Sequence, residues 1–79
     1  MPYVYILNSI ADKDRMYVGI TQSLEHRLQE HNSGEGIHTA KYKPWKMMTY
    51  LYFDNIEKAI AFEKYLKSGS GRSFAKRHL

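Results

Sequence analysis

The chain has 79 residues, a formal net charge of +4 and no cysteine. Its length predicts a single domain over residues 1–79, and the lack of cysteine excludes disulfides and thiolate zinc sites as sources of stability. No apolar run approaches the roughly 18 residues that a membrane span needs, and no signal sequence opens the chain, so we expect a cytoplasmic protein without membrane contacts. The basic balance favours a polyanionic partner, although a small domain can also owe positive charge to solubility alone.

Two β-favouring runs come first. Residues 3–7 predict a strand in which the odd-numbered side chains, including Tyr5, share one face. A polar turn then leads to a second strand at residues 16–20, where Tyr17 and Gly19 share a face. Glycine weakens a strand, so Gly19 predicts either a bulge or a close approach to the backbone by substrate or a catalytic side chain.

An amphipathic helix is predicted at residues 24–32, after hydroxyl side chains that can cap its first turn. Leu24 and Leu28 define its apolar stripe at a helical spacing of about 100° per residue. His31 then lies about 40° and Arg27 about 80° from the centre of that stripe. A cation and an imidazole beside a buried face need a partner or a functional role, because burying charge is costly.

The helix is expected to end at the glycine-rich residues 33–36, and residues 37–44 to form an exposed loop. This loop carries Lys41, Tyr42 and Lys43. Basic residues interleaved with an aromatic ring suit a nucleic-acid strand, because lysines contact phosphates and a ring can stack on a base.

Residues 45–53 predict a third, aromatic strand, and a second helix follows from a cap at position 54 or 55 to residue 67. Glu63 lies near the middle of the helix's apolar stripe, where an ionised carboxylate requires a cation, a metal or access to solvent. Residues 68–71 are expected to end this helix, and residues 72–79 to form a short basic one. The stripe consists of Ile56, Ala59, Ile60, Phe62 and Leu66.

Five polar residues on these elements suit phosphodiester hydrolysis if the fold brings them together. Arg27 can bind a phosphate through two nitrogens and neutralise charge that builds in the transition state. A lone carboxylate such as that of Glu63 suits Mg²⁺, which takes one or two protein oxygens and keeps most of its waters. Tyr5 or Tyr17 could act as a general base if its phenolate were favoured, and His31 could relay a proton.

Each of these residues also has a structural explanation. Strand tyrosines usually pack with the hydroxyl at the rim, and Arg27 can cover the core with its stem. His31 could cap helix carbonyls, and Glu63 could be an ion-pair partner of Arg27. A zinc site has little support, because metal-ligand spacing is lacking at His26, His38 and His78.

With these residues in view, the chain resembles the GIY-YIG nuclease superfamily over nearly its whole length, and most closely its short stand-alone bacterial members. Residues 3–5, Tyr-Val-Tyr, are similar to the first signature, and residues 17–19, Tyr-Val-Gly, match the second almost verbatim. Arg27 follows the second tyrosine by ten residues, as the family's catalytic arginine does. His31 and Glu63 match the histidine one turn later and the metal-binding glutamate.

The resemblance implies an α+β fold, a three-stranded antiparallel sheet flanked by about three helices in the order β-β-α-β-α-α. It implies an endonuclease of low sequence specificity that hydrolyses DNA, or in some members RNA, with Mg²⁺ or Mn²⁺ on Glu63. The tyrosine pair then shares the chemistry, with Tyr17 favoured for activating water and Tyr5 for positioning substrate. Tight sequence recognition would need a homodimer or a partner protein, since no added DNA-binding domain is present.

One departure from the family keeps other functions open. Many members carry an asparagine after the glutamate, whereas residues 70–76 contain none, and Ser70, Arg72 or Ser73 would have to replace it. The chain could therefore be a catalytically weak or inactive nucleic-acid-binding module, or, as a third hypothesis, a protein-interaction module built on its tyrosines. The residues expected to contact nucleic acid are Lys41, Tyr42, Lys43, Arg72 and Lys76.

Overall fold

A computed structural model describes residues 2–34 and 39–79 of the chain. It contains three strands, three α-helices and one short 3₁₀ helix, and so confirms the predicted class and element order. The elements are β1 (Tyr3–Ser9), β2 (Met16–Thr21), α1 (Leu24–Ser33), η1 (Ala40–Tyr42), β3 (Trp45–Tyr52), α2 (Ile56–Lys67) and α3 (Gly69–His78).

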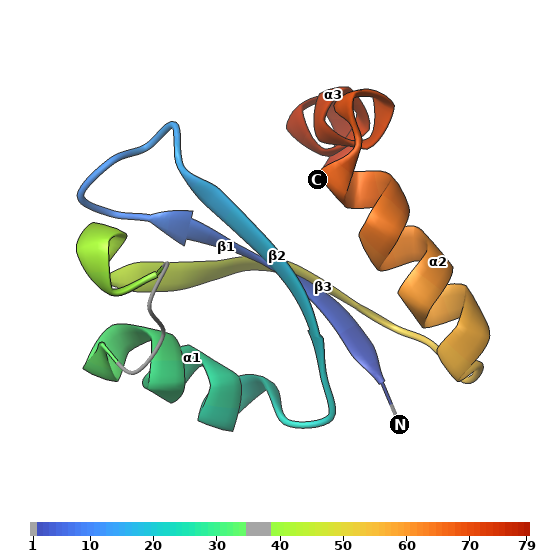
Figure 1. The fold of residues 1–79 in the computed structure, drawn as a ribbon, viewed down its shortest axis with the longest axis horizontal. Coiled ribbons are helices and arrows are strands. Elements are labelled where there is room, and N and C mark those ends of the chain that lie inside the picture. Colours follow the sequence, from blue (N-terminus) through green and yellow to red (C-terminus); the bar gives the residue numbers. More distant parts are fainter. Residues whose placement is uncertain (1, 35–38) are drawn as a thin grey trace.

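The molecule has three layers, with the sheet in the middle (Figure 1). Both neighbours of β1 are antiparallel to it, in the order β2-β1-β3, so β2 and β3 are the two edges of the sheet. Helix α1 covers one face, and α2 and α3 cover the other. Side chains at the outer edge of β2 therefore lie between the two helical layers.

The two faces of the sheet have different cores. Alternate β1 residues point to opposite faces, as the sequence predicts. On the α2/α3 face the buried side chains are aliphatic or small: Val4, Ile6, Val18, Ala59, Leu66 and Ala75. On the α1 face the buried hydrophobic side chains are Tyr5, Leu7 and Trp45, so this core contains groups that need hydrogen-bond partners.

Hydrogen-bonding caps fix the ends of the helices. Ser23 Oγ accepts the His26 N–H at the start of α1, and Asn55 Oδ1 accepts the Lys58 N–H at the start of α2. Gly34 ends α1 with φ of 84°, a left-handed conformation that favours glycine. Among the described residues, no helix has both the length and the apolarity needed to traverse a lipid bilayer.

The junction between α2 and α3 differs from the prediction. Residues 69–71 were expected to end one helix, but they form the first turn of α3, and Ser68 alone separates the two helices. Ser68 Oγ accepts the Gly71 N–H, which starts the new helix. Gly71 lies against the carbonyl of Tyr65 where no side chain would fit, so its glycine lets α3 fold back on α2.

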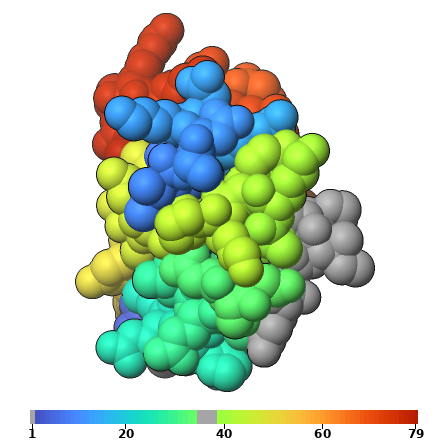
Figure 2. All heavy atoms as spheres, turned by 90° about the vertical axis from the view of Figure 1, so that its left-hand side faces the viewer, coloured from blue at the N-terminus to red at the C-terminus, as the bar shows by residue number. Residues whose placement is uncertain are grey.

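The segment before β3 is also more ordered than an exposed loop. Residues 37 and 38, and the glycine-rich residues 35 and 36, lie outside the described part of the chain. Thr39 is buried and its carbonyl accepts the Trp45 indole N–H at 2.8 Å, while Ser9 Oγ donates to the Tyr42 carbonyl at 2.6 Å. Figure 2 shows this segment filling the space between the β1–β2 turn and α1. Trp45 causes the difference, because its buried indole ties the segment to the core.

Candidate active site at the edge of strand β2

Tyr5 and Gly19 are direct partners in the β1–β2 ladder, and the phenol of Tyr5 lies over Gly19. A Cβ at position 19 would collide with the hydroxyl and ring of Tyr5. The close approach that the glycine predicts is therefore made by a tyrosine side chain. Tyr17 is paired with Leu7, which makes it a diagonal neighbour of Tyr5, and the two tyrosine ring centroids are 6.2 Å apart.

His31 joins this pair from α1. Its Nε2 lies 3.1 Å from the Tyr5 hydroxyl and its Nδ1 2.9 Å from Thr39 Oγ1, while its ring centroid is 4.6 Å from that of Tyr17. The imidazole is only 7% exposed. Both ring nitrogens are thus engaged by hydroxyl groups, so His31 orients Tyr5 and does not cap helix carbonyls.

The local electrostatics keep Tyr5 and His31 neutral. Burial, followed by the neighbouring Tyr17, raises the pKa of Tyr5 well above its usual value near 10, and Arg27 only partly opposes this. Burial and then Arg27 lower the pKa of His31 below 6.5, against an opposing effect of Glu30. Near neutral pH the Tyr5 phenol can therefore donate a hydrogen bond, whereas it is a poor candidate for general base.

Arg27 lines an open hollow and carries a donor without a partner among the described residues. Its Nε is buried and has no hydrogen-bond partner among the described residues, because Glu30 Oε1 at 3.8 Å is close enough for an ion pair but too far for a hydrogen bond. The side chain lines a hollow of about 300 Å³ at the end of β2, together with Ile56 and Ile60 of α2. A buried N–H without an acceptor is uncommon, and a bound phosphate oxygen would supply one.

Glu63 belongs to the other helical layer. It lies on α2, 18% exposed at the side chain, and pairs with Lys67 at 3.3 Å rather than with Arg27. Its charge still contributes to raising the pKa of Tyr5, which places the carboxylate within electrostatic reach of the tyrosine. Tyr5, Tyr17, His31 and Arg27 thus lie on the α1 side of the sheet, whereas Glu63 lies on α2, which covers the opposite face.

The apolar stripe of α2 is only partly buried, which corrects the prediction from its spacing. Ala59 and Leu66 are fully buried, but Ile56 and Ile60 are 51% and 42% exposed. Their contacts explain this difference, since both isoleucines line the hollow that contains Arg27. Ile56 and Ile60 therefore form a wall of the hollow, whereas Ala59, in the same half of α2, packs in the core.

The described residues offer few protein ligands for a metal ion at Glu63. Among the described residues, no group of three or more His, Cys, Asp or Glu side chains could hold a metal; His38 lies outside them. Zinc needs three or four protein ligands, whereas Mg²⁺ takes one or two carboxylates plus water and phosphate oxygens. A single carboxylate such as that of Glu63 fits the second pattern.

The residues expected to contact nucleic acid fall into two groups. Lys41 in η1 and Lys43 just after it are exposed, but Tyr42 is half-buried, with the guanidinium of Arg15 4.7 Å from its ring centroid. This partial burial leaves less of the ring free for base stacking. The other group, Arg72 and Lys76, lies on α3, and Arg15 lines the same hollow as this pair.

Three residues with contacts to the site were not predicted. Glu30 pairs with Arg27 three residues before it, and Lys67 pairs with Glu63 four residues before it, so helical spacing could have indicated both. Thr39 had no such signal. It reaches His31 only because the segment before β3 folds back against α1.

The antiparallel sheet with helices on both faces defines a small α+β domain. A family model described as GIY-YIG catalytic domain matches residues 1–77, and the chain belongs to this family. The two signatures, residues 3–5 and 17–19, form the paired strands that hold the tyrosines.

The chain is also similar to individual proteins from other organisms. UPF0213 protein CPE1444 of Clostridium perfringens is 38% identical over 71 residues, which cover 85% of this chain and 71% of that protein. UPF0213 protein HQ_3675A of Haloquadratum walsbyi is 34% identical over 67 residues, which cover 84% of this chain and 73% of that protein. The structure-specific endonuclease subunit SLX1 of Debaryomyces hansenii is 32% identical over 71 residues, 81% of this chain but only 20% of that protein.

Proposed function

We propose that this protein is a divalent-cation-dependent endonuclease that hydrolyses phosphodiester bonds of DNA, or alternatively RNA, with low sequence specificity. Its membership of the GIY-YIG family supports nuclease activity in general. The observation that carries the proposal is Arg27, whose side chain lines a hollow at the end of β2 and whose buried Nε has no hydrogen-bond partner among the described residues. That donor suits a non-bridging phosphate oxygen, and the guanidinium would neutralise charge developing there.

The tyrosines take different roles in this proposal. Tyr5 stays a neutral phenol because its pKa is raised, and its bond to His31 holds the hydroxyl over Gly19. It can orient substrate or water but is poorly suited to accept a proton. Tyr17 is half-buried beside the His31 ring and is the member of the pair left to accept the proton of the attacking water.

Glu63 would hold the cation, with Mg²⁺ or Mn²⁺ as candidates. When bound, such an ion polarises the phosphate and lowers the pKa of water. Lys67 occupies one carboxylate oxygen of Glu63 in this structure and would have to turn away. This movement is feasible because Lys67 is half-exposed and the pair is of a kind that contributes little stability.

The test is a substrate panel of plasmid, branched and single-stranded DNA and RNA, each with and without Mg²⁺. We expect metal-dependent cleavage that falls by on the order of 10² to 10³ in Glu63→Gln and in Arg27→Ala. Glu57→Gln and Arg77→Ala are matched controls, since both residues are exposed on the same kinds of element and lie outside the two hollows. Equal cleavage by all four variants would contradict the proposal.

A binding module without efficient chemistry is the second candidate. It is favoured by α3, which carries no asparagine between residues 70 and 76 where many relatives of this family have one. Ser70 and Ser73 are exposed on this helix, and Arg72 lines a hollow beside Lys67. Salt-sensitive binding with no metal-dependent cleavage of any substrate in the panel would support this function instead.

A further inference from the structure

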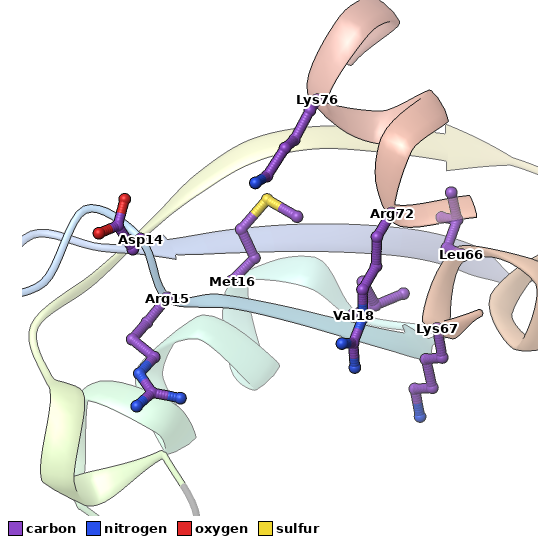
Figure 3. A pocket seen from close by; sticks show the side chains of 8 residues that line it. All are labelled: Asp14, Arg15, Met16, Val18, Leu66, Lys67, Arg72 and Lys76. Atoms are coloured by element: carbon purple, nitrogen blue, oxygen red, sulfur yellow. The ribbon is translucent and has the colours of Figure 1, made fainter. Parts of the chain in front are cut away.

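A second hollow, of about 450 Å³, lies at the start of β2, under the junction between α2 and α3. Its floor is apolar and includes Met16 and Val18 of β2. Its walls carry the side chains of Lys67 from α2 and of Arg72 and Lys76 from α3, which extend toward β2 (Figure 3). It is therefore a basic hollow on the same edge strand that borders the candidate active site.

The cations of this hollow are mostly available to a ligand. Arg72 and Lys76 are exposed and form no ion pair within residues 2–34 and 39–79. They are four residues apart on α3, so both side chains lie on one face of that helix. Asp14 is the one acidic lining residue in the described part of the chain, and Figure 3 shows its carboxylate at the far end from Arg72. The hollow is thus positively charged overall.

Lys67 connects this hollow to the candidate active site. It lines the hollow and its Nζ is 3.3 Å from Glu63 Oε2. The hollow that contains Arg27 borders the other end of β2, at Ile20 and Thr21. Since a strand rises about 3.4 Å per residue, the five steps from Met16 to Thr21 span about 17 Å, a length that several nucleotides of an extended strand can follow.

We propose that the hollow lined by Lys67, Arg72 and Lys76 binds backbone phosphates of the nucleic-acid strand on one side of the cleavage point. The identity of this ligand rests on the proposed nuclease function. The strand would run along the edge of β2, with Arg27 at one end, Glu63 in between and the basic hollow at the other. Arginine and lysine are the side chains that most often contact phosphates, and such contacts set position rather than sequence preference. Low sequence specificity follows.

The test measures binding without cleavage. Fluorescence anisotropy of short fluorescein-labelled single-stranded and duplex DNA is recorded in EDTA at several NaCl concentrations. The double variant Arg72→Gln/Lys76→Gln should bind roughly tenfold more weakly, and the slope of log K against log salt should become shallower by about 1.4 to 1.8, as expected for two lost phosphate contacts.

The control is Lys64→Gln/Arg77→Gln, which removes one exposed charge from α2 and one from α3, both outside the hollow. It should bind nearly as well as the unmodified protein, with an unchanged slope. Equal losses in both double variants, or no binding of DNA by the unmodified protein, would overturn the inference. Circular dichroism melting checks that all proteins are folded.

This experiment separates the inference from the proposed function. Loss of affinity confined to the hollow variant, together with no cleavage of the substrate panel in Mg²⁺, would support the phosphate site while contradicting the nuclease. Metal-dependent cleavage with equal affinity in both double variants would support the nuclease and contradict the phosphate site. Tighter binding of an acidic peptide than of DNA, lost in the hollow variant, would also contradict it.

Discussion

The two faces of the sheet use one central strand for different purposes. Toward α2 and α3, β1 contributes Val4 and Ile6 to an aliphatic core. Toward α1 it contributes Tyr5, whose hydroxyl is buried against His31 and whose ring covers Gly19. One face therefore gains stability from apolar burial, whereas the other uses hydrogen bonds among buried polar groups to fix a phenol. Stability and chemistry should respond separately to substitutions on the two faces.

The largest effect on stability is expected on the aliphatic face. Leu66 is 1% exposed, so Leu66→Ala should reduce the free energy of unfolding by about 2 to 5 kcal/mol, measured by urea denaturation. Leu66 also lines the basic hollow, so this prediction is read from stability alone. Ile10→Ala, at a residue 55% exposed, is the control and should cost far less. An equal cost for both would contradict the placement of Leu66 in the core.

Gly19→Ala tests the contact across the α1 face. The added Cβ would push the Tyr5 phenol away from its position, which should cost about 1 to 3 kcal/mol of stability and lower the cleavage rate. Gly69→Ala is the matched control, because a Cβ there meets no atom within 4 Å. Alanine also favours helix over glycine, so this control should be neutral or slightly stabilising. Both changes are read by thermal melting and by cleavage assays.

Tyr5→Phe removes one hydroxyl from the polar face and leaves the ring in place. His31 Nε2 then loses its partner, which should cost about 1 to 3 kcal/mol. The misplaced substrate or water should lower cleavage by up to about 10²-fold. Tyr65→Phe, at an exposed tyrosine on α2, is the control. Full activity in Tyr5→Phe would show that the buried hydroxyl serves folding alone.

The smallest effect is a pH dependence of stability. The folded protein lowers the pKa of His31 below 6.5, the ordinary pKa of a histidine side chain. Below about that pH the unfolded chain therefore binds a proton at this residue more readily than the folded protein does, which favours unfolding. The melting temperature should therefore fall as the pH drops from about 7.5 to 5, a range that lies mostly above carboxylate titration. His31→Gln should flatten this dependence, whereas His26→Gln, at an exposed histidine, should preserve it. An identical profile in His31→Gln would show that another group causes the slope.

Local patterns in the sequence predict most of the fold. The alternation in β1, the caps at Ser23 and Asn55 and the glycine exit at Gly34 depend on neighbouring residues, and each agrees with the structure. The exceptions depend on tertiary contacts. The α3 helix begins early because Gly71 packs on α2, and the segment before β3 is held in place by the buried indole of Trp45.

The candidate site is harder to read from the sequence for a related reason. Tyr5, Tyr17 and His31 meet through strand pairing and one helix contact, which spacing can suggest. The relation of Glu63 to them depends on where α2 crosses the edge of β2, and no local pattern encodes that crossing. The same crossing leaves Ile56 and Ile60 exposed at the hollow, although their spacing predicts burial.

The most direct test of how the two layers meet is an NMR titration of the ¹⁵N-labelled protein with Mn²⁺, which broadens signals of nearby nuclei. If a cation held by Glu63 lies at the edge of β2, broadening should include the amides of Gly19 and Ile20 and the Arg27 Nε–H signal, and should disappear in Glu63→Gln. The amides of Lys46 and Met47, on the opposite edge strand, should be affected least. Broadening that stays on α2 and α3, or that persists in Glu63→Gln, would contradict a shared site between the layers.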